Sequence, residues 1–72
     1  MHFEQLIKII KRRREVLQIT QEDLAELSGV GLRTIKQFES GKGNPTLQTM
    51  QKLLDVLGME IRLTIKEITS NR

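Results

Sequence analysis

One stretch in the first half of the chain decides the fold: TQEDLAELSGVGLRTIKQFES, residues 20–40. Thr20 has the side chain of an N-cap, and Asp23, three residues later, completes a variant of the capping box. These two residues predict a helix over 21–28. Gly29 follows directly, and glycine readily adopts the left-handed conformation that ends a helix. The stretch therefore opens with a short helix that has both its start and its stop signal.

The spacing within residues 21–40 is that of two short helices joined by a tight turn. Ala25, the fifth of these twenty positions, is small where two helices cross closely, and Gly29, the ninth, supplies a positive φ in the turn. Ile35 and Phe38, the fifteenth and eighteenth, face inward and fix the crossing. Each feature is common by chance, but all four in register indicate a helix-turn-helix unit.

Further helices are expected on both sides of this unit, whose second helix spans 32–40. Residues 3–17 carry apolar side chains within about 100° of one another, which is the width of one buried stripe on a helix. Residues 41–45, Gly-Lys-Gly-Asn-Pro, give the strongest loop signal in the chain. A fourth helix is expected over 46–57, with Gly58 closing it. The sequence thus predicts four helices around one core.

A period of two replaces the helical period over residues 59–66. Met59, Ile61, Leu63 and Ile65 alternate with polar residues, which is typical of a half-buried strand. Because a lone strand cannot satisfy its backbone groups, we expect it to pair with its own copy, antiparallel across a twofold axis. An axis at Leu63 pairs opposite charges and uses nearly the whole segment. The predicted dimer is therefore built on this strand.

The composition limits the class of protein. A chain of 72 residues is a single domain, 1–72, with a thin stability margin, for which a partner subunit is one support. The absence of cysteine and the presence of one histidine, His2, exclude disulfides and a zinc site, so neither metal nor cofactor is expected.

No more than two apolar residues stand together, so neither a membrane span nor a signal peptide is expected, and the cytosol is the predicted location. Twelve Lys and Arg against nine Asp and Glu give a net charge of +3, a mild tilt toward an anionic partner. Residues 67–72 carry no clear pattern.

Roughly residues 3 to 58 resemble the Cro/CI-type (Xre) helix-turn-helix family of bacterial and phage regulators. The residues that carry the resemblance are Thr20-Gln21, Leu24-Ala25, Gly29-Val30, Ile35, Phe38-Glu39-Ser40-Gly41-Lys42 and Pro45-Thr46-Leu47. A strand in place of the family's usual fifth helix is similar to the HipB-type antitoxin branch, whose members end in a dimerising strand and repress their own operon. Two residues depart from the family pattern: Gln18, where glycine often ends the first helix, and Gly31, which replaces a capping Ser or Thr.

Helix phase then predicts which side chains of 32–40 face DNA, since the N-terminal end of this helix reaches base edges in the motif. Arg33 can bond guanine bidentately, Gln37 can do the same with adenine, and Leu32 can contact a thymine methyl group. The predicted base contacts are Leu32, Arg33, Lys36 and Gln37. The predicted phosphate contacts are Gln21, Thr34, Ser40 and Lys42. A solvated helix face without any ligand would carry similar residues.

The basic run at residues 11–14 divides by helix phase. Arg14 falls on the buried stripe of its helix and Glu39 on the inward side of the recognition helix. Two opposite charges directed into one small core should pair, and the family resemblance implies the same salt bridge. Lys11 to Arg13 fit a solvated face and a phosphate-facing one equally well.

The fold class expected is therefore mainly α: a compact four-helix helix-turn-helix DNA-binding domain followed by one C-terminal strand that pairs across a dimer. The expected function is sequence-specific binding of double-stranded DNA at a palindromic operator by a dimeric repressor. The antitoxin resemblance adds a toxin as a possible protein partner. A stand-alone phage-type repressor and a protein-binding adaptor that kept the fold but lost DNA contact are the alternatives. No catalytic constellation is present, so an enzyme is not expected.

Overall fold

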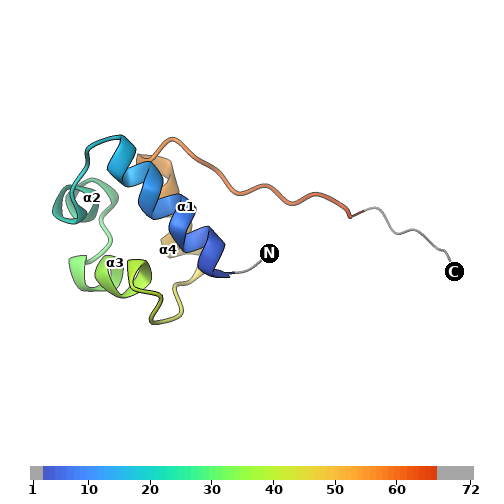
Figure 1. Ribbon diagram of the computed structural model, residues 1–72, viewed down its shortest axis with the longest axis horizontal. Helices are drawn as coiled ribbons and strands as arrows, with labels where there is room; N and C mark the ends of the chain where they lie inside the picture. The colour runs from blue at the N-terminus through green and yellow to red at the C-terminus, as the bar shows by residue number, and fades with distance from the viewer. Residues whose placement is uncertain (1–2, 67–72) are drawn as a thin grey trace, which may run out of the picture.

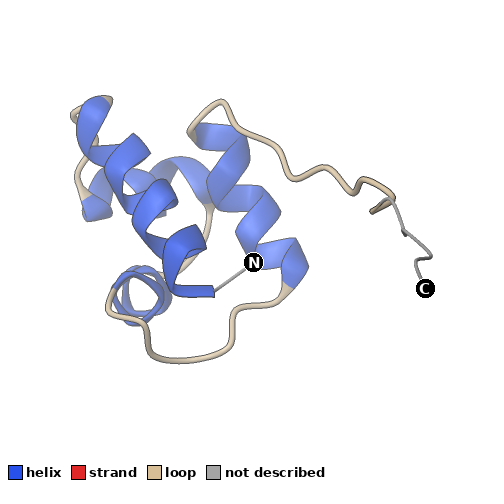
Figure 2. Cartoon of the chain, turned by 45° about the vertical axis from the view of Figure 1, so that its right-hand side comes forward, coloured by secondary structure: helices blue, strands red, loops and turns tan. Residues whose placement is uncertain are grey.

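Residues 3–66, the part of the chain that the computed structural model describes, form four helices joined by loops (Figure 1, Figure 2). The helices are α1 (Phe3–Val16), α2 (Gln21–Ser28), α3 (Leu32–Glu39) and α4 (Leu47–Val56). Each lies within a residue of its predicted bounds, so the mainly helical fold class is confirmed. His2 and the tail 67–72 lie outside the described residues.

The core is a single apolar cluster to which every helix contributes. α2 packs against both α3 and α4, and α1 packs against α3. The rings of Phe3 and Phe38 also form a T-shaped pair, with centroids 6.3 Å apart. The buried apolar residues are Ile7, Ile10, Leu24, Val30, Ile35, Phe38, Met50, Leu53, Leu54 and Leu57. Packing of these side chains holds α2 and α3 as one unit against the other two helices.

The start and the end of α2 follow the local signals in the sequence. The Asp23 backbone N–H donates to Thr20 Oγ1 at 3.0 Å, and the Thr20 N–H donates to Asp23 Oδ2 at 3.2 Å. Both hydrogen bonds of the predicted capping box are therefore present. Gly29 has φ 77° and donates its N–H to the Ala25 carbonyl, as a left-handed C-cap does. These contacts fix the turn that leads into α3.

The loop that connects α1 to α2 contains a residue in an unfavourable conformation. Gln18 has φ 59°, and it is the one non-glycine with positive φ among the described residues. A side chain in the left-handed region places Cβ close to the following carbonyl oxygen, which glycine avoids. The departure from the family pattern at Gln18 therefore has a conformational cost.

The expected strand over 59–66 is not formed in the single chain. This segment leaves the end of α4 and runs away from the helices as an extended coil (Figure 1). Met59 remains partly packed on the core, and its N–H donates to the Leu54 carbonyl at 2.9 Å. Leu63 and Ile65 are 96% and 99% exposed. The physical reason is that a strand needs a second strand to bond its backbone groups, and residues 3–66 of one chain supply none.

Candidate nucleic-acid interface

The outer face of α3 is polar and basic. Its inner face consists of Ile35, Phe38 and Glu39, all buried. Because Glu39 is the sole acidic residue of α3, the outer face carries no negative charge. The residues predicted to contact DNA from this helix and its C-cap lie on the outer side: Arg33, Thr34, Lys36, Gln37 and Ser40 are exposed, and Leu32 is half-buried.

The N-terminus of α3 is not capped by a side chain. Gly31 occupies the N-cap position with an extended backbone, and no side-chain hydrogen bond reaches the first turn. The first backbone N–H groups of a helix have no intrahelical acceptor and carry the positive end of the helix dipole. Arg33, which is exposed, adds a full positive charge to the same turn. This end of α3 is therefore electropositive.

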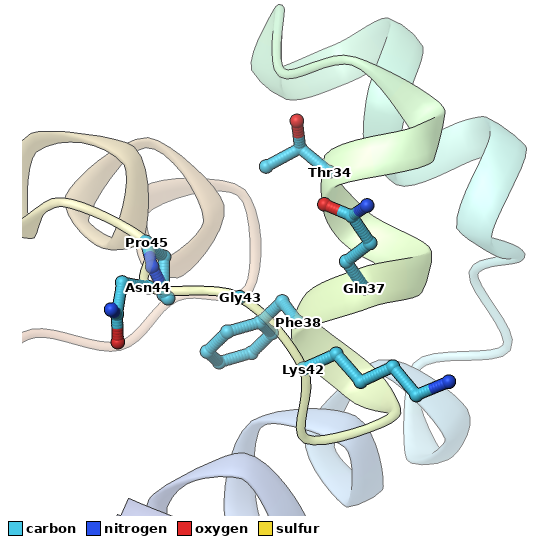
Figure 3. Close-up of a pocket in the computed structure, with 7 residues that line it drawn as sticks. All are labelled: Thr34, Gln37, Phe38, Lys42, Gly43, Asn44 and Pro45. Atoms are coloured by element: carbon cyan, nitrogen blue, oxygen red, sulfur yellow. The ribbon is translucent and has the colours of Figure 1, made fainter.

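A hollow of about 220 Å³ separates α3 from the loop that follows it (Figure 3). It is lined by Thr34, Gln37, Phe38, Lys42, Gly43, Asn44 and Pro45. The loop is tied to the helix because the Lys42 N–H donates to the Gln37 carbonyl at 2.8 Å. Gly43 has φ 81°, a left-handed conformation that favours glycine in this loop. The Lys42 ammonium points outward past the end of α3 (Figure 3).

Gln21, a predicted phosphate contact, has a partner inside the protein. Its side chain is half-buried, and its Nε2 donates to Glu39 Oε1 at 2.9 Å. One of the two amide hydrogens is therefore used internally and one remains for another acceptor. The next two residues, Glu22 and Asp23, are exposed and acidic, which makes this helix start less attractive to a phosphate than that of α3.

Arg14 and Glu39 form a bidentate ion pair between α1 and α3. Arg14 Nε donates to Glu39 Oε2 at 2.7 Å and Arg14 Nη2 donates to Oε1 at 3.0 Å. The two side chains are 11% and 3% exposed. Arg14 Nη1 also donates to the Ile19 carbonyl at 2.7 Å. The hydrogen bond to Glu39 raises the pKa of Arg14 despite the opposing effect of burial. The pair therefore links α1, the loop before α2, and α3.

The remaining residues of the basic run separate onto two sides of α1. Lys11 lines a groove together with Ser40 and Gly41, at the C-terminal end of α3. Arg13 faces the other way, and its Nε donates to the Leu57 carbonyl at 2.9 Å, at the end of α4. Arg12 lies on the same side as Arg13. Of these three residues, Lys11 is therefore the one beside the α3 face.

Two contacts of this region were not expected from the sequence. They are the bond from Gln21 to Glu39 and the bond from Arg13 to the Leu57 carbonyl. The first joins α2 to α3 and the second joins α1 to the C-cap residue of α4, so no spacing rule within one helix could have found them. The amphipathic phase of α1 placed Arg14 inward but gave no partner for Arg13.

Comparison with known proteins identifies the family. A helix-turn-helix family model, HTH_3, matches residues 10–63, and the chain belongs to this family. It is 41% identical over 58 residues to an uncharacterized HTH-type transcriptional regulator of Haemophilus influenzae and 33% identical over 52 residues to the cryptic phage CTXphi transcriptional repressor RstR of Vibrio cholerae. These alignments cover 81% and 72% of this chain but 59% and 46% of the two relatives. An uncharacterized HTH-type regulator of Methanocaldococcus jannaschii is 38% identical over 52 residues, which is 72% of this chain and 79% of that protein. The Cro/CI-type resemblance is thereby confirmed.

Within residues 3–66, no helix is long and apolar enough to cross a membrane. The same residues contain no group of three or more His, Cys, Asp or Glu side chains placed to hold a metal ion.

Proposed function

We propose that this protein is a sequence-specific, double-stranded-DNA-binding transcriptional repressor that inserts α3 into the major groove. The observation that carries the proposal is the outer face of α3, which is exposed, basic and free of acidic side chains. Arg33 and Gln37 read guanine and adenine, and Lys36 and Leu32 make the neighbouring base contacts. A protein-binding adaptor that had lost DNA contact would have no need of this set of side chains.

Phosphate contacts on both sides of the groove hold α3 in register. Thr34 and Lys42, which border the hollow beside α3, and Ser40 at the helix end reach one backbone strand. Gln21 reaches the other strand with the amide hydrogen that Glu39 leaves free. Because Glu39 bonds both Arg14 and Gln21, it orients this contact relative to α3.

The repressor acts as a homodimer on a palindromic operator. Residues 59–66, which are extended and unpaired in the single chain, form an antiparallel pair with the same segment of a second copy, centred on Leu63. The twofold axis makes the two recognition helices equivalent, and about 34 Å between them would match one turn of DNA.

Cysteine variants test this register, because the chain has no native cysteine. Under mild oxidation Leu63→Cys should form a covalent dimer faster than Ile61→Cys or Arg62→Cys. Faster cross-linking at 61 or 62 would overturn the register. A monomeric parent in sedimentation at micromolar concentration would overturn the dimer.

The biological role proposed is that of an antitoxin that represses its own operon, with a toxin bound on surfaces away from α3. It rests on the HipB-like pattern of a helix-turn-helix domain followed by a β-patterned segment. A stand-alone phage-type repressor is the second candidate, favoured by the 33% identity to the phage repressor. Expression of the adjacent gene with and without this protein decides between them. Growth inhibition relieved by this protein supports the antitoxin role, and absence of inhibition leaves the stand-alone repressor.

Direct readout by α3 is tested on the operator, obtained beforehand by selection from random duplex DNA. Arg33→Ala and Gln37→Ala should each weaken binding by roughly 1–3 kcal/mol, since each removes a bidentate base contact. Fluorescence anisotropy at fixed salt measures the affinity. Lys52→Ala, which removes an exposed charge from α4, is the matched control and should bind much as the parent does. Parental affinity in both α3 variants would refute the assignment.

A further inference from the structure

An apolar groove runs along the side of α1 that faces away from α3. Ile9 and Val16 are 55% and 56% exposed, although both are large apolar residues. They are seven residues apart and therefore lie on one side of the helix, about 10 Å from each other along its axis. The groove has a volume of about 410 Å³ and is lined by Lys8, Ile9, Arg12, Arg13, Val16 and Met59. Its floor is apolar and its rim is basic.

The segment that begins at this groove presents the complementary surface. Met59 lines the groove, and the next apolar residues, Ile61, Leu63 and Ile65, follow at alternate positions. Leu63 and Ile65 are almost completely exposed. Within the described chain, residues 60–66 form no backbone hydrogen bond. Two apolar surfaces, the groove and one face of this segment, thus adjoin at Met59 and both face solvent in the single chain.

We propose that the groove on α1 is the floor on which the paired strands of the dimer lie, so that each protomer's α1 contacts its partner's C-terminal segment. This inference rests on the proposed dimer and names the surface that covers its strands. With the pair centred on Leu63, the partner subunit's Ile65 lies opposite Ile61. The Cβ atoms of a directly opposite cross-strand pair lie about 5 Å apart, so the pair fits within the roughly 10 Å between Ile9 and Val16.

The second copy fits the groove better than the chain's own tail. In Figure 1 the segment runs outward from the end of α4. Leu63 and Ile65, its last two apolar residues, are therefore left without a cover in the single chain. Hydrogen bonds between two paired strands bury neither face of the ribbon, so a two-stranded ribbon needs packing on its apolar face for stability. In the single chain Ile61 is partly covered and lines a hollow with Gln51 and Leu54 of α4. The proposed pairing moves Ile61 from this hollow to the adjoining groove, which shares Met59 with it. Glu60 and Arg62, which form an exposed ion pair, alternate with the apolar residues and therefore point away from the groove.

Sedimentation equilibrium tests the role of the groove. Ile9→Glu and Val16→Glu should each raise the dimer dissociation constant about tenfold or more, because each places a charge in the apolar floor. Leu27→Glu is the matched control, since Leu27 is an equally large and exposed apolar residue on α2. Far-UV circular dichroism and binding to a DNA half-site confirm that the variants keep the helical domain. Parental dimer affinity in both groove variants would overturn the proposal.

Cross-linking between differently labelled chains tests the contact itself. An Ile9→Cys or Val16→Cys chain mixed with an Ile65→Cys chain should give a covalent heterodimer under mild oxidation. Cross-linking of Leu63→Cys homodimers without any such heterodimer would mean that the strands pair elsewhere, which refutes this contact but leaves the dimer and DNA binding intact. A disulfide confined to one chain carrying both Ile9→Cys and Ile65→Cys would show that the tail folds back on its own groove and would also refute the proposal.

Discussion

The buried ion pair between α1 and α3 makes Glu39→Ala the most informative change for stability. This substitution removes two hydrogen bonds from Arg14 and one from Gln21. It leaves a guanidinium that is 11% exposed with the Ile19 carbonyl as its remaining acceptor. Breaking a buried ion pair costs about 3–5 kcal/mol. Because Arg14 keeps one hydrogen bond and some contact with water, we expect the lower end, about 3 kcal/mol.

A loss of this size is a large part of the stability of a small domain. For a domain of 60–100 residues it corresponds to a fall in Tm of about 12–24 °C. Urea denaturation followed by circular dichroism measures it, at one protein concentration because dimerisation would shift the midpoint. Glu26→Ala, which removes an exposed carboxylate from α2, serves as the control, with an expected change below about 0.5 kcal/mol.

Double replacement separates pairing from burial. Arg14→Met with Glu39→Leu removes both charges and should cost far less than the two single changes together, since no charge is left buried. Single effects that simply add in the double variant would refute the claim that the two residues stabilise each other.

Three further changes have expected outcomes. Lys42→Ala should weaken specific and non-specific DNA binding alike and lower the salt slope by about one unit, and an unchanged slope would exclude the phosphate contact. Thr20→Ala should cost about 1 kcal/mol of unfolding free energy because it removes the side-chain acceptor of the Asp23 N–H at the start of α2, and an unchanged midpoint in urea denaturation would contradict this. Gln18→Gly should raise stability by about 0.5–1 kcal/mol by relieving the positive φ, whereas a lower midpoint would show that the side chain contributes more than its backbone costs.

Features that depend on neighbours along the chain were predictable from the sequence. The capping box of Thr20 and Asp23 and the left-handed Gly29 are local, and the structure contains them as expected. Helical phase also placed Arg14 and Glu39 inward, and the structure brings them into contact.

Features that depend on contacts between elements were less predictable. Leu27 and Leu47 are apolar residues of helix faces, yet both are exposed, because short helices bury only the side that meets a neighbour. The amide of Gln21 suits a phosphate and a carboxylate equally, and only the fold shows that Glu39 is within reach. The alternation over 59–66 indicates extended backbone, but a strand exists only with a partner.

Parallel selection from random duplex DNA tests most directly whether α3 reads base sequence. The parent and Arg33→Ala are selected at the same stated salt concentration, since phosphate binding alone varies with salt. The parent should enrich two inverted half-sites about one helical turn apart. Arg33→Ala should lose its preference at one symmetry-related position in each half-site and keep the others. No enrichment by the parent, or the same site enriched by both proteins, would contradict the account.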